Sequence, residues 1–137
     1  MLLLLASLLL AAASGCAESD TAKVERAEKN LRELIKQSKF AEIYRQASSV
    51  LKSSEKEEEF VANLREISQK TGEIVTVEKV DVHEFVSQKS PTAPPSTIYI
   101  MHLLKGKSSS CYEGKLWVIE GGEARLLAYD CLFTVKN

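Results

Sequence analysis

Residues 60–85, FVANLREISQKTGEIVTVEKVDVHEF, contain the point at which the chain changes from a helical to an extended pattern. Before this point, apolar residues recur at the spacing of one helix face: Phe60, Val61, Leu64 and Ile67. Glycine readily adopts the positive φ that ends many helices, so we expect this helix to stop at Thr71-Gly72. After it the sequence is rich in valine, which is typical of a strand over residues 74–85.

The valines of this strand change phase within it. Val75 and Val77 would share one face of a regular strand, whereas Val80 and Val82 would share the other. The change falls at Glu78-Lys79 and predicts a bulge or a sharp bend there. Such irregularities are a common way to curve a sheet.

Two further helical patterns precede the deciding stretch. Apolar stripes run over residues 21–38 and again over residues 40–51. In the first stripe, Glu28 precedes Arg32 by four residues, a favourable pair on a solvated helix face. We expect the third helix to open at Ser54, with Glu57 completing a capping box.

Three more strands are expected after the first, over residues 97–104, 111–119 and 125–135. The last two read as a hairpin across Glu120-Gly121-Gly122-Glu123. A proline-rich segment, residues 90–96, would cross between the first and second strands. The predicted fold class is therefore α+β, with about three N-terminal helices packed on a curved four-stranded antiparallel sheet. Residues 21–137 would form a single domain.

The sequence begins with a stretch typical of a signal peptide. Residues 2–13 are all small or apolar, and this run is too short to span a bilayer. The following Ala13-Ser14-Gly15-Cys16 resembles the lipobox of bacterial lipoproteins. That resemblance implies removal of residues 1–15 and diacylation of Cys16, with residues 16–20 as anchor and short tether. It also implies attachment to a membrane of the cell envelope, the outer membrane in a Gram-negative host, with the domain facing the periplasm or the exterior.

With Cys16 assigned to lipid, Cys111 and Cys131 form an even pair in an exported chain, which indicates a disulfide. A two-residue hairpin turn would place Cys111 opposite Leu132. A three-residue loop, or a bulge at one of the glycines, would place the two cysteines directly opposite each other. Two free buried thiols or a catalytic thiol are the alternatives.

Three segments together resemble the nuclear transport factor 2-like fold, also grouped as cystatin-like. They are Phe40-Ala41-Glu42-Ile43-Tyr44, the helix from Glu59-Phe60-Val61 to Gly72, and the strands that end near Ala128-Tyr129. Within that group the chain is similar to small exported bacterial domains of unknown function. The resemblance implies a cone between sheet and helices that can hold a ligand. Some members are isomerases, dehydratases or hydrolases, whereas many only bind partners or dimerise through the sheet.

The charge balance argues against a nucleic-acid partner. The chain has 18 basic and 19 acidic residues, and neither residues 18–72 nor residues 73–137 carry a basic surplus. The two histidines, His83 and His102, lie on separate predicted strands, so no metal site is expected. No motif for a cofactor is present either.

Enzymes of the resembled fold place acid–base groups inside the cone, and five residues here could lie there: Tyr99, His102, Tyr112, Tyr129 and Asp130. His102 shares a strand face with Ile98, Ile100 and Leu104, which predicts a histidine in an apolar environment. The topology permits a His102–Asp130 dyad but does not require one. We therefore assign no catalytic residue from the sequence.

Two functions remain open at this point. The first is a non-catalytic module at the membrane surface that binds a protein partner or forms a homodimer through its sheet. The second is a small-molecule binder or weak acid–base enzyme that uses the cone. A filled cone with an apolar outer sheet face would favour the first, and a polar-lined cavity containing His102 would favour the second. The sequence names no ligand for either.

Overall fold

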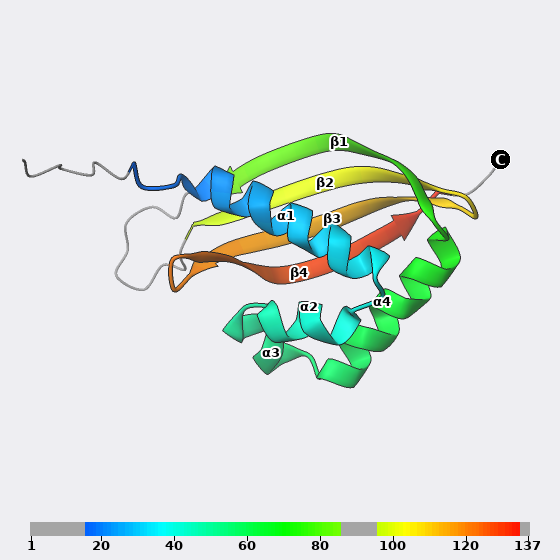
Figure 1. Ribbon diagram of the computed structural model, residues 1–137, viewed down its shortest axis with the longest axis horizontal. Coiled ribbons are helices and arrows are strands. Elements are labelled where there is room, and N and C mark those ends of the chain that lie inside the picture. The colour runs from blue at the N-terminus through cyan, green and yellow to red at the C-terminus, as the bar shows by residue number, and fades with distance from the viewer. Residues whose placement is uncertain (1–15, 86–95, 135–137) are drawn as a thin grey trace, which may run out of the picture.

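The computed structural model describes residues 16–85 and 96–134. In this part of the chain four helices precede a four-stranded sheet (Figure 1), which confirms the predicted α+β class. The elements are α1 (Asp20–Lys36), α2 (Phe40–Gln46), α3 (Ser49–Ser54), α4 (Glu57–Thr71), β1 (Ile74–Phe85), β2 (Thr97–Gly106), β3 (Ser110–Glu120) and β4 (Glu123–Phe133). The expected leader, residues 1–15, and residues 90–95 of the expected proline-rich connection lie outside the described residues.

The second predicted helix is in fact two helices. The chain becomes extended at Ala47, and the Ser48 side chain then caps α3 by accepting a hydrogen bond from the Leu51 amide. The predicted capping box at Ser54 and Glu57 is wrong, because Ser54 ends α3 and Lys56 is the N-cap of α4. The predicted stop of α4 is confirmed, since Gly72 follows Thr71 with φ of 72°.

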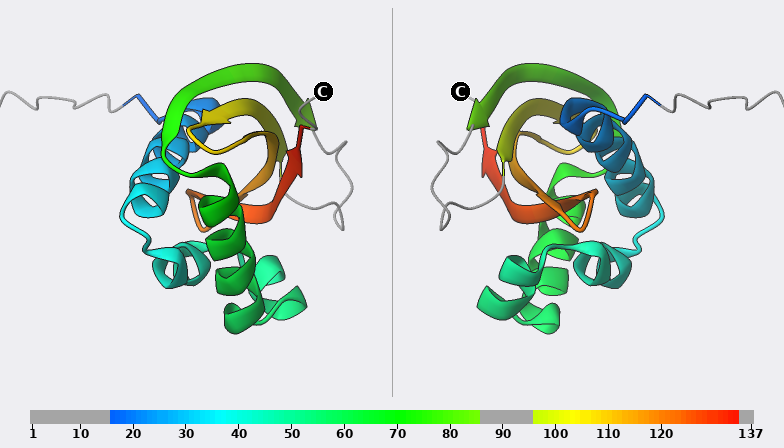
Figure 2. Two further views of the ribbon diagram at one scale, coloured as in Figure 1. Left: turned by 90° about the vertical axis from the view of Figure 1, so that its right-hand side faces the viewer. Right: turned by 90° about the vertical axis from the view of Figure 1, so that its left-hand side faces the viewer.

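The strands pair in the order β1-β2-β3-β4, all antiparallel, and the sheet is strongly curved (Figure 2). The predicted irregularity in β1 is confirmed one residue later than expected. The register shifts between Lys79 and Asp81, so that Val77 pairs with Leu104 and Val82 with Ile100. The extra residue cancels the change of phase, and both valines lie on the same face.

We call the sheet face that carries Ile98, Ile100, His102 and Leu104 the inner face, and the opposite one the outer face. Helix α1 lies against the inner face, while α2, α3 and α4 pack together beside β4 (Figures 1 and 2). The predicted grouping of His102 with three aliphatic residues on one buried face is confirmed. The predicted apolar environment of His102 is wrong, because its Nδ1 lies 3.1 Å from Lys115 Nζ. The core contains helical residues such as Val24, Leu31, Phe40 and Phe60 together with Trp117 and Leu126 of the hairpin.

The C-terminal end of α4 is hydrogen-bonded to the turn between β2 and β3. The amides of Ser108 and Ser109 donate to the Thr71 carbonyl, and the Ser109 hydroxyl donates to the Lys70 carbonyl at 2.7 Å. These bonds satisfy carbonyl groups that a helix leaves unpaired at its C-terminus. They also set the direction in which β1 leaves the helix.

The hairpin turn has two residues, Gly121 and Gly122, with φ of 62° and 80°. Positive φ at both positions is what a type I′ turn requires. A bulge in β4 then shifts the register between Leu116 and Trp117. As a result Cys111 lies opposite Phe133, and Cys131 lies opposite Glu113.

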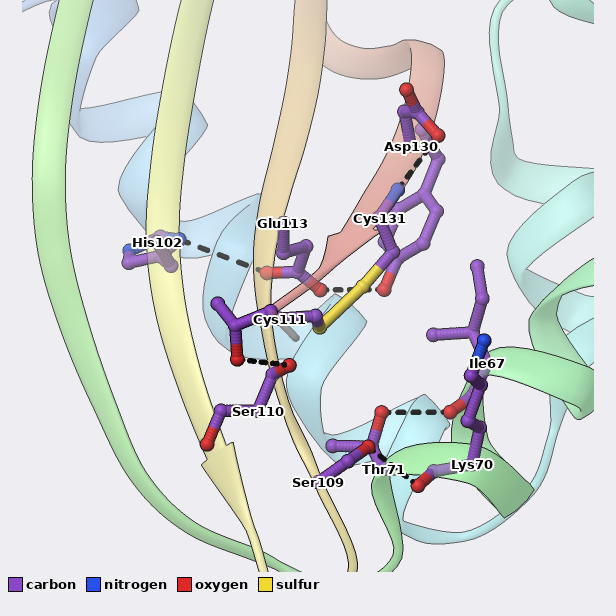
Figure 3. The surroundings of a disulfide bond; sticks show 12 residues. Ile67, Lys70, Thr71, His102, Ser109, Ser110, Cys111, Glu113, Asp130 and Cys131 are labelled. Atoms are coloured by element: carbon purple, nitrogen blue, oxygen red, sulfur yellow. Dashed lines mark hydrogen bonds and ion pairs between the residues drawn. A yellow bond between two sulfur atoms is a disulfide. The ribbon is translucent and has the colours of Figure 1, made fainter. Parts of the chain in front are cut away.

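The predicted Cys111–Cys131 disulfide is present, with the two Cα atoms 6.0 Å apart (Figure 3). Neither of the two registers considered from the sequence is found, because Cys111 lies opposite neither Leu132 nor Cys131. The bulge moves the register away from these pairings, so the bond joins diagonal neighbours of β3 and β4. Cross-strand diagonal positions on one face are close enough for long side chains to meet.

Removing this disulfide is expected to destabilise the fold without changing its topology. In the chain-entropy model, closing a loop of this length contributes about 3 kcal/mol. Urea unfolding of a Cys111→Ala/Cys131→Ala variant should show a loss of this order and no further loss on adding reductant. The wild type should lose stability only when reductant is present. Equal unfolding curves for wild type with and without reductant would contradict this account.

Candidate functional site

Charged side chains occupy the centre of the inner face. On β3, Glu113, Lys115 and Trp117 alternate with outer-face residues and therefore all point toward α1. The side chains of Glu113 and Lys115 are fully buried, with 0% exposed. From the opposite side, α1 contributes Glu28 and Arg32, which lie one helical turn apart.

Lys115 is held by three acceptors. Its Nζ donates to Glu113 Oε2 at 2.6 Å and to Glu28 Oε2 at 2.7 Å, and it lies 3.1 Å from His102 Nδ1. An ammonium group has three hydrogens, so this geometry satisfies all of them when Nδ1 is unprotonated. The other carboxylate oxygen of Glu28 accepts a hydrogen bond from Trp117 Nε1 at 2.6 Å.

Glu113 is the most heavily bonded acid in the structure described. Besides Lys115, it accepts from Arg32 Nη2 at 2.5 Å, from Arg32 Nη1 at 3.2 Å and from Tyr129 Oη at 2.6 Å. Burial by itself would raise the pKa of Glu113, but the charges and hydrogen bonds of Lys115 and Arg32 lower it to about 2. The Glu113 carboxylate is therefore ionised at neutral pH.

Two partners of Glu113, Tyr129 and Arg32, keep their protons. Burial, and then the nearby Glu113 charge, raise the pKa of Tyr129 well above its ordinary value, so its phenol remains a donor. Burial alone would lower the pKa of Arg32, but Glu113 raises it. The pairing of Arg32 with Glu113 is bidentate, which fixes the orientation of both groups.

His102 takes part as a neutral acceptor. It is 8% exposed, and burial followed by the charge of Lys115 lowers its pKa. Its Nδ1 lies 3.8 Å from both the Glu28 and the Glu113 carboxylates. Figure 3 shows the approach of His102 on β2 to Glu113 on β3. Because the Nδ1 lone pair faces Lys115, this nitrogen is not available to take a proton from a substrate.

We call these seven residues the inner charge network: Glu28, Arg32, His102, Glu113, Lys115, Trp117 and Tyr129. Its two carboxylates balance its two cations. In the described part of the chain, every buried side-chain nitrogen or oxygen has a hydrogen-bond partner. The network thus joins α1 to β2, β3 and β4, and its polar groups are bonded to one another.

A hollow of about 540 Å³ opens beside the network, between α1, α4 and β1. Arg32 and Tyr129 reach its edge. Its other walls combine apolar residues (Ile35, Leu64, Ile67, Val75, Val77 and Leu104) with polar and charged ones (Glu33, Lys36, Ser68, Thr71 and Glu73). We call it the distal hollow, because it lies at the end of the sheet away from the N-terminus. His102 lies outside its lining, so it does not combine a cavity with the histidine.

The outer face has a different character. It contains a hollow of about 460 Å³ around Gly114, which we call the outer hollow. Its lining residues on the outer face are Tyr99, Met101, Tyr112, Gly114, Leu116, Ala128, Asp130 and Leu132, and Lys115 and Tyr129 also contribute to the lining. Leu132 is 70% exposed and Tyr112 is 38% exposed. Large apolar side chains that stay exposed together on one sheet face are typical of an interaction surface.

The five candidate acid–base residues are divided between the two faces. His102 and Tyr129 belong to the inner charge network, whereas Tyr99, Tyr112 and Asp130 line the outer hollow. His102 lies opposite Glu113, and Asp130 lies opposite Gly114. Successive residues of β3 point to opposite faces, so a His102–Asp130 dyad is not formed.

Sequence reasoning missed the four charged residues at the centre of the network. Glu28 and Arg32 were interpreted as a solvated pair, although both reach the sheet. The sequence did contain a signal, the alternation of Cys111, Glu113, Lys115 and Trp117 along one strand. Cysteine and tryptophan are usually buried, so the two opposite charges between them should lie on a buried face. That pattern indicates a buried ion pair that needs partners from another element.

The N-terminal end of the domain is tied to the hairpin turn. Cys16 is exposed, and α1 begins only four residues later, at Asp20. Arg26 donates to Glu18 at 2.9 Å and to Glu123 at 3.2 Å, so the tether and the β3–β4 turn share one contact. Figure 1 shows both at the same end of the molecule, with the strands running away from it.

Neither a family model nor a curated protein matches this sequence. Within residues 16–85 and 96–134, none of the helices is long and apolar enough to cross a membrane. The site must therefore be judged on its own geometry.

Breaking the inner charge network should be costly. Lys115→Met keeps the length of the side chain but leaves the Glu113 and Glu28 carboxylates without their shared cation. Removing one partner of a buried pair typically costs about 3–5 kcal/mol, and urea unfolding should show a loss of this order. Lys107→Met is the matched control, because the Lys107–Glu73 pair is exposed and should contribute less than about 1 kcal/mol. Similar small losses for both variants would contradict a buried network.

The acid limb of the stability curve should depend on Glu113. Its pKa is about 2 in the folded protein, against an ordinary value of 4.5. As the pH falls, the unfolded chain binds the proton first, so the stabilisation is complete above pH 4.5 and is lost between pH 4.5 and pH 2. This difference corresponds to on the order of 3 kcal/mol.

A Glu113→Gln variant should be less stable than wild type at neutral pH and should lose less additional stability in that acid window. Urea unfolding at a series of pH values measures both quantities. If the two proteins lose stability in parallel as the pH falls, Glu113 is not the group whose protonation unfolds the chain.

Proposed function

We propose that this protein is an exported, lipid-anchored module that binds a partner protein on the outer face of its sheet and performs no catalysis. The observation that carries the proposal is the outer hollow, around which Tyr112 and Leu132 remain exposed. The buried polar groups of the inner charge network, by contrast, are bonded to one another. A hollow with exposed apolar side chains at its border is suited to contact with another protein.

The hydrogen bonds of the inner face support this proposal. An acid–base enzyme needs a titrating group with a free lone pair or proton directed at substrate. Here His102 accepts from Lys115, Glu113 accepts from three neighbours, and Tyr129 donates to Glu113. The cone of the resembled fold is thus occupied at its centre by side chains that hold each other.

The place of the tether supports a role at a membrane surface. If Cys16 carries lipid, the shared contact of Arg26 with Glu18 and Glu123 holds the hairpin-turn end of the domain toward the membrane. The strands then extend away from the membrane, and the outer face lies roughly perpendicular to the membrane plane. A partner in the same membrane, or one arriving from the compartment, can reach it.

A small molecule in the distal hollow is the second candidate. Its volume lies within the range of ligand sites, and Arg32 and Tyr129 supply polar groups at its edge. Against it, both groups already bond Glu113. Native mass spectrometry of the full-length protein, extracted from its host's membranes, would separate the candidates. Mass that leaves under mild activation would support the hollow, and a purely lipidated mass would support partner binding.

The lipid anchor has its own test. Intact-mass analysis of the purified wild-type protein should show a chain that begins at Cys16 and carries acyl groups. Cys16→Ser should lose the acyl mass and the membrane association, because anchoring depends on the buried acyl chains. A mature chain that begins at any other residue would contradict the lipobox assignment.

Site-specific photocrosslinking in the host tests the binding face. A photoreactive phenylalanine analogue at Leu132, on the outer face, should give a defined crosslinked species. The same analogue at Val50 of α3 is the control, since Val50 is also an exposed apolar residue, at 57%, but lies on a helix. Crosslinks at Val50 but not at Leu132, or equal diffuse crosslinks at both, would contradict an outer-face partner.

A further inference from the structure

We propose that the outer hollow is a socket for a basic side chain, arginine or lysine, carried by the partner protein. This inference rests on the proposed function and adds to it the chemistry by which the partner is recognised. It follows from the shape of the hollow, from the groups that surround it and from the charge of the face in which it lies.

The shape comes from Gly114 and the residues around it. Its strand neighbours along the outer face are Tyr112 and Leu116, and its cross-strand neighbours are Met101 and Asp130. A Cβ at this position would lie only 3.0 Å from Tyr99 Oη, so the Tyr99 ring extends over the glycine. The Tyr99 side chain therefore covers Gly114, and the outer hollow is bordered by this ring together with Tyr112, Met101 and Asp130.

The groups around the outer hollow favour a cation. Tyr99 and Tyr112 present aromatic rings, and Asp130 presents a carboxylate. An aromatic face attracts a guanidinium or an ammonium group, and arginine can also stack on a ring and bond a carboxylate through two nitrogens. An apolar side chain would fill the outer hollow but would leave the Asp130 carboxylate beside it without a counter-charge.

Asp130 is available for such a contact. Its Oδ1 accepts a hydrogen bond from the backbone amide of Cys131 at 2.8 Å, and within residues 16–85 and 96–134 no cation pairs with it. The side chain of the neighbouring Lys115 is directed to the inner face and is fully buried. Thus the lining of the hollow contains a carboxylate that a partner can neutralise.

The charge of the surrounding face also favours a basic ligand. At the levels of Met101 and Leu103 the outer face carries the carboxylates of Glu78 and Asp130. Lys105 lies on the same face and approaches Glu78 at 4.0 Å. A second copy of this chain would bring acid against acid, whereas a partner with a basic side chain would complement the face.

The apolar border identifies the cation as a side chain of a protein. Leu132, Met101 and Leu116 would stay in water around a small free amine. A basic residue flanked by apolar residues would cover them and fill the outer hollow at the same time. Burial of this apolar surface would add to the free energy of the charge contact. A protein segment can supply both contributions, whereas a small amine cannot.

The test is a selection of peptides from a random displayed library on the full-length protein in detergent micelles. The selected peptides should carry an arginine or lysine between apolar residues. Their affinity should fall roughly threefold to tenfold for Asp130→Asn and for Tyr112→Leu, as expected for the loss of a partly exposed charge pair or cation–π contact. Asparagine keeps an oxygen for the Cys131 amide, so Asp130→Asn should fold normally.

Two controls separate this inference from the proposed function. Glu66→Gln removes an exposed carboxylate from α4 and should leave the affinity unchanged. Leu132→Ser should weaken every ligand of the outer face, whatever its charge. Peptides that respond to Leu132→Ser but not to Asp130→Asn would overturn the socket and keep the outer-face function. Peptides that respond to neither variant, or failure to select any, would count against both.

Discussion

The buried ammonium group of Lys115 is the constraint on which the arrangement of this domain depends. A fully buried charge is tolerated only when neighbouring groups compensate it. Glu113 beside it and Glu28 across from it provide that compensation, and His102 takes the third hydrogen. Since these partners come from α1, β2 and β3, the requirement of one ammonium group fixes how the first helix lies on the sheet.

The same requirement distinguishes the two faces of the sheet. With the inner face committed to the network, α1 cannot move away without separating Glu28 from Lys115 and Arg32 from Glu113. The outer face makes no comparable demand. It keeps Tyr99, Tyr112 and Leu132 around a glycine, and a partner can occupy this space without disturbing the core. The disulfide adds to the rigidity of β3 and β4, the two strands that carry most of the outer hollow.

Local patterns predicted the elements, because they depend on spacing within a few residues. The stop at Gly72, the irregularity of β1 and the hairpin at Gly121-Gly122 were predicted in this way, whereas the Cys111–Cys131 pair was predicted from the cysteine count of an exported chain. The register was not, since the bulge near Leu127 has no distinct sequence signal, and it moved Cys131 opposite Glu113. The network was missed because Glu28 and Arg32 satisfy a local rule for solvated pairs, while their actual partners lie more than 80 residues away, for example Glu113 for Arg32 with a separation of 81.

An imidazole ¹⁵N titration of His102 in the full-length protein tests the central claim most directly, with the signal assigned by a His83→Gln variant. Burial and Lys115 lower the pKa of His102, so the unfolded chain binds this proton first, and stability should fall as the pH drops below the ordinary value of 6.5. We predict that Nδ1 remains an unprotonated acceptor through pH 6.5 while the protein stays folded. A His102 that titrates at or above 6.5, without loss of structure, would show an inner face open to water and would contradict the closed network.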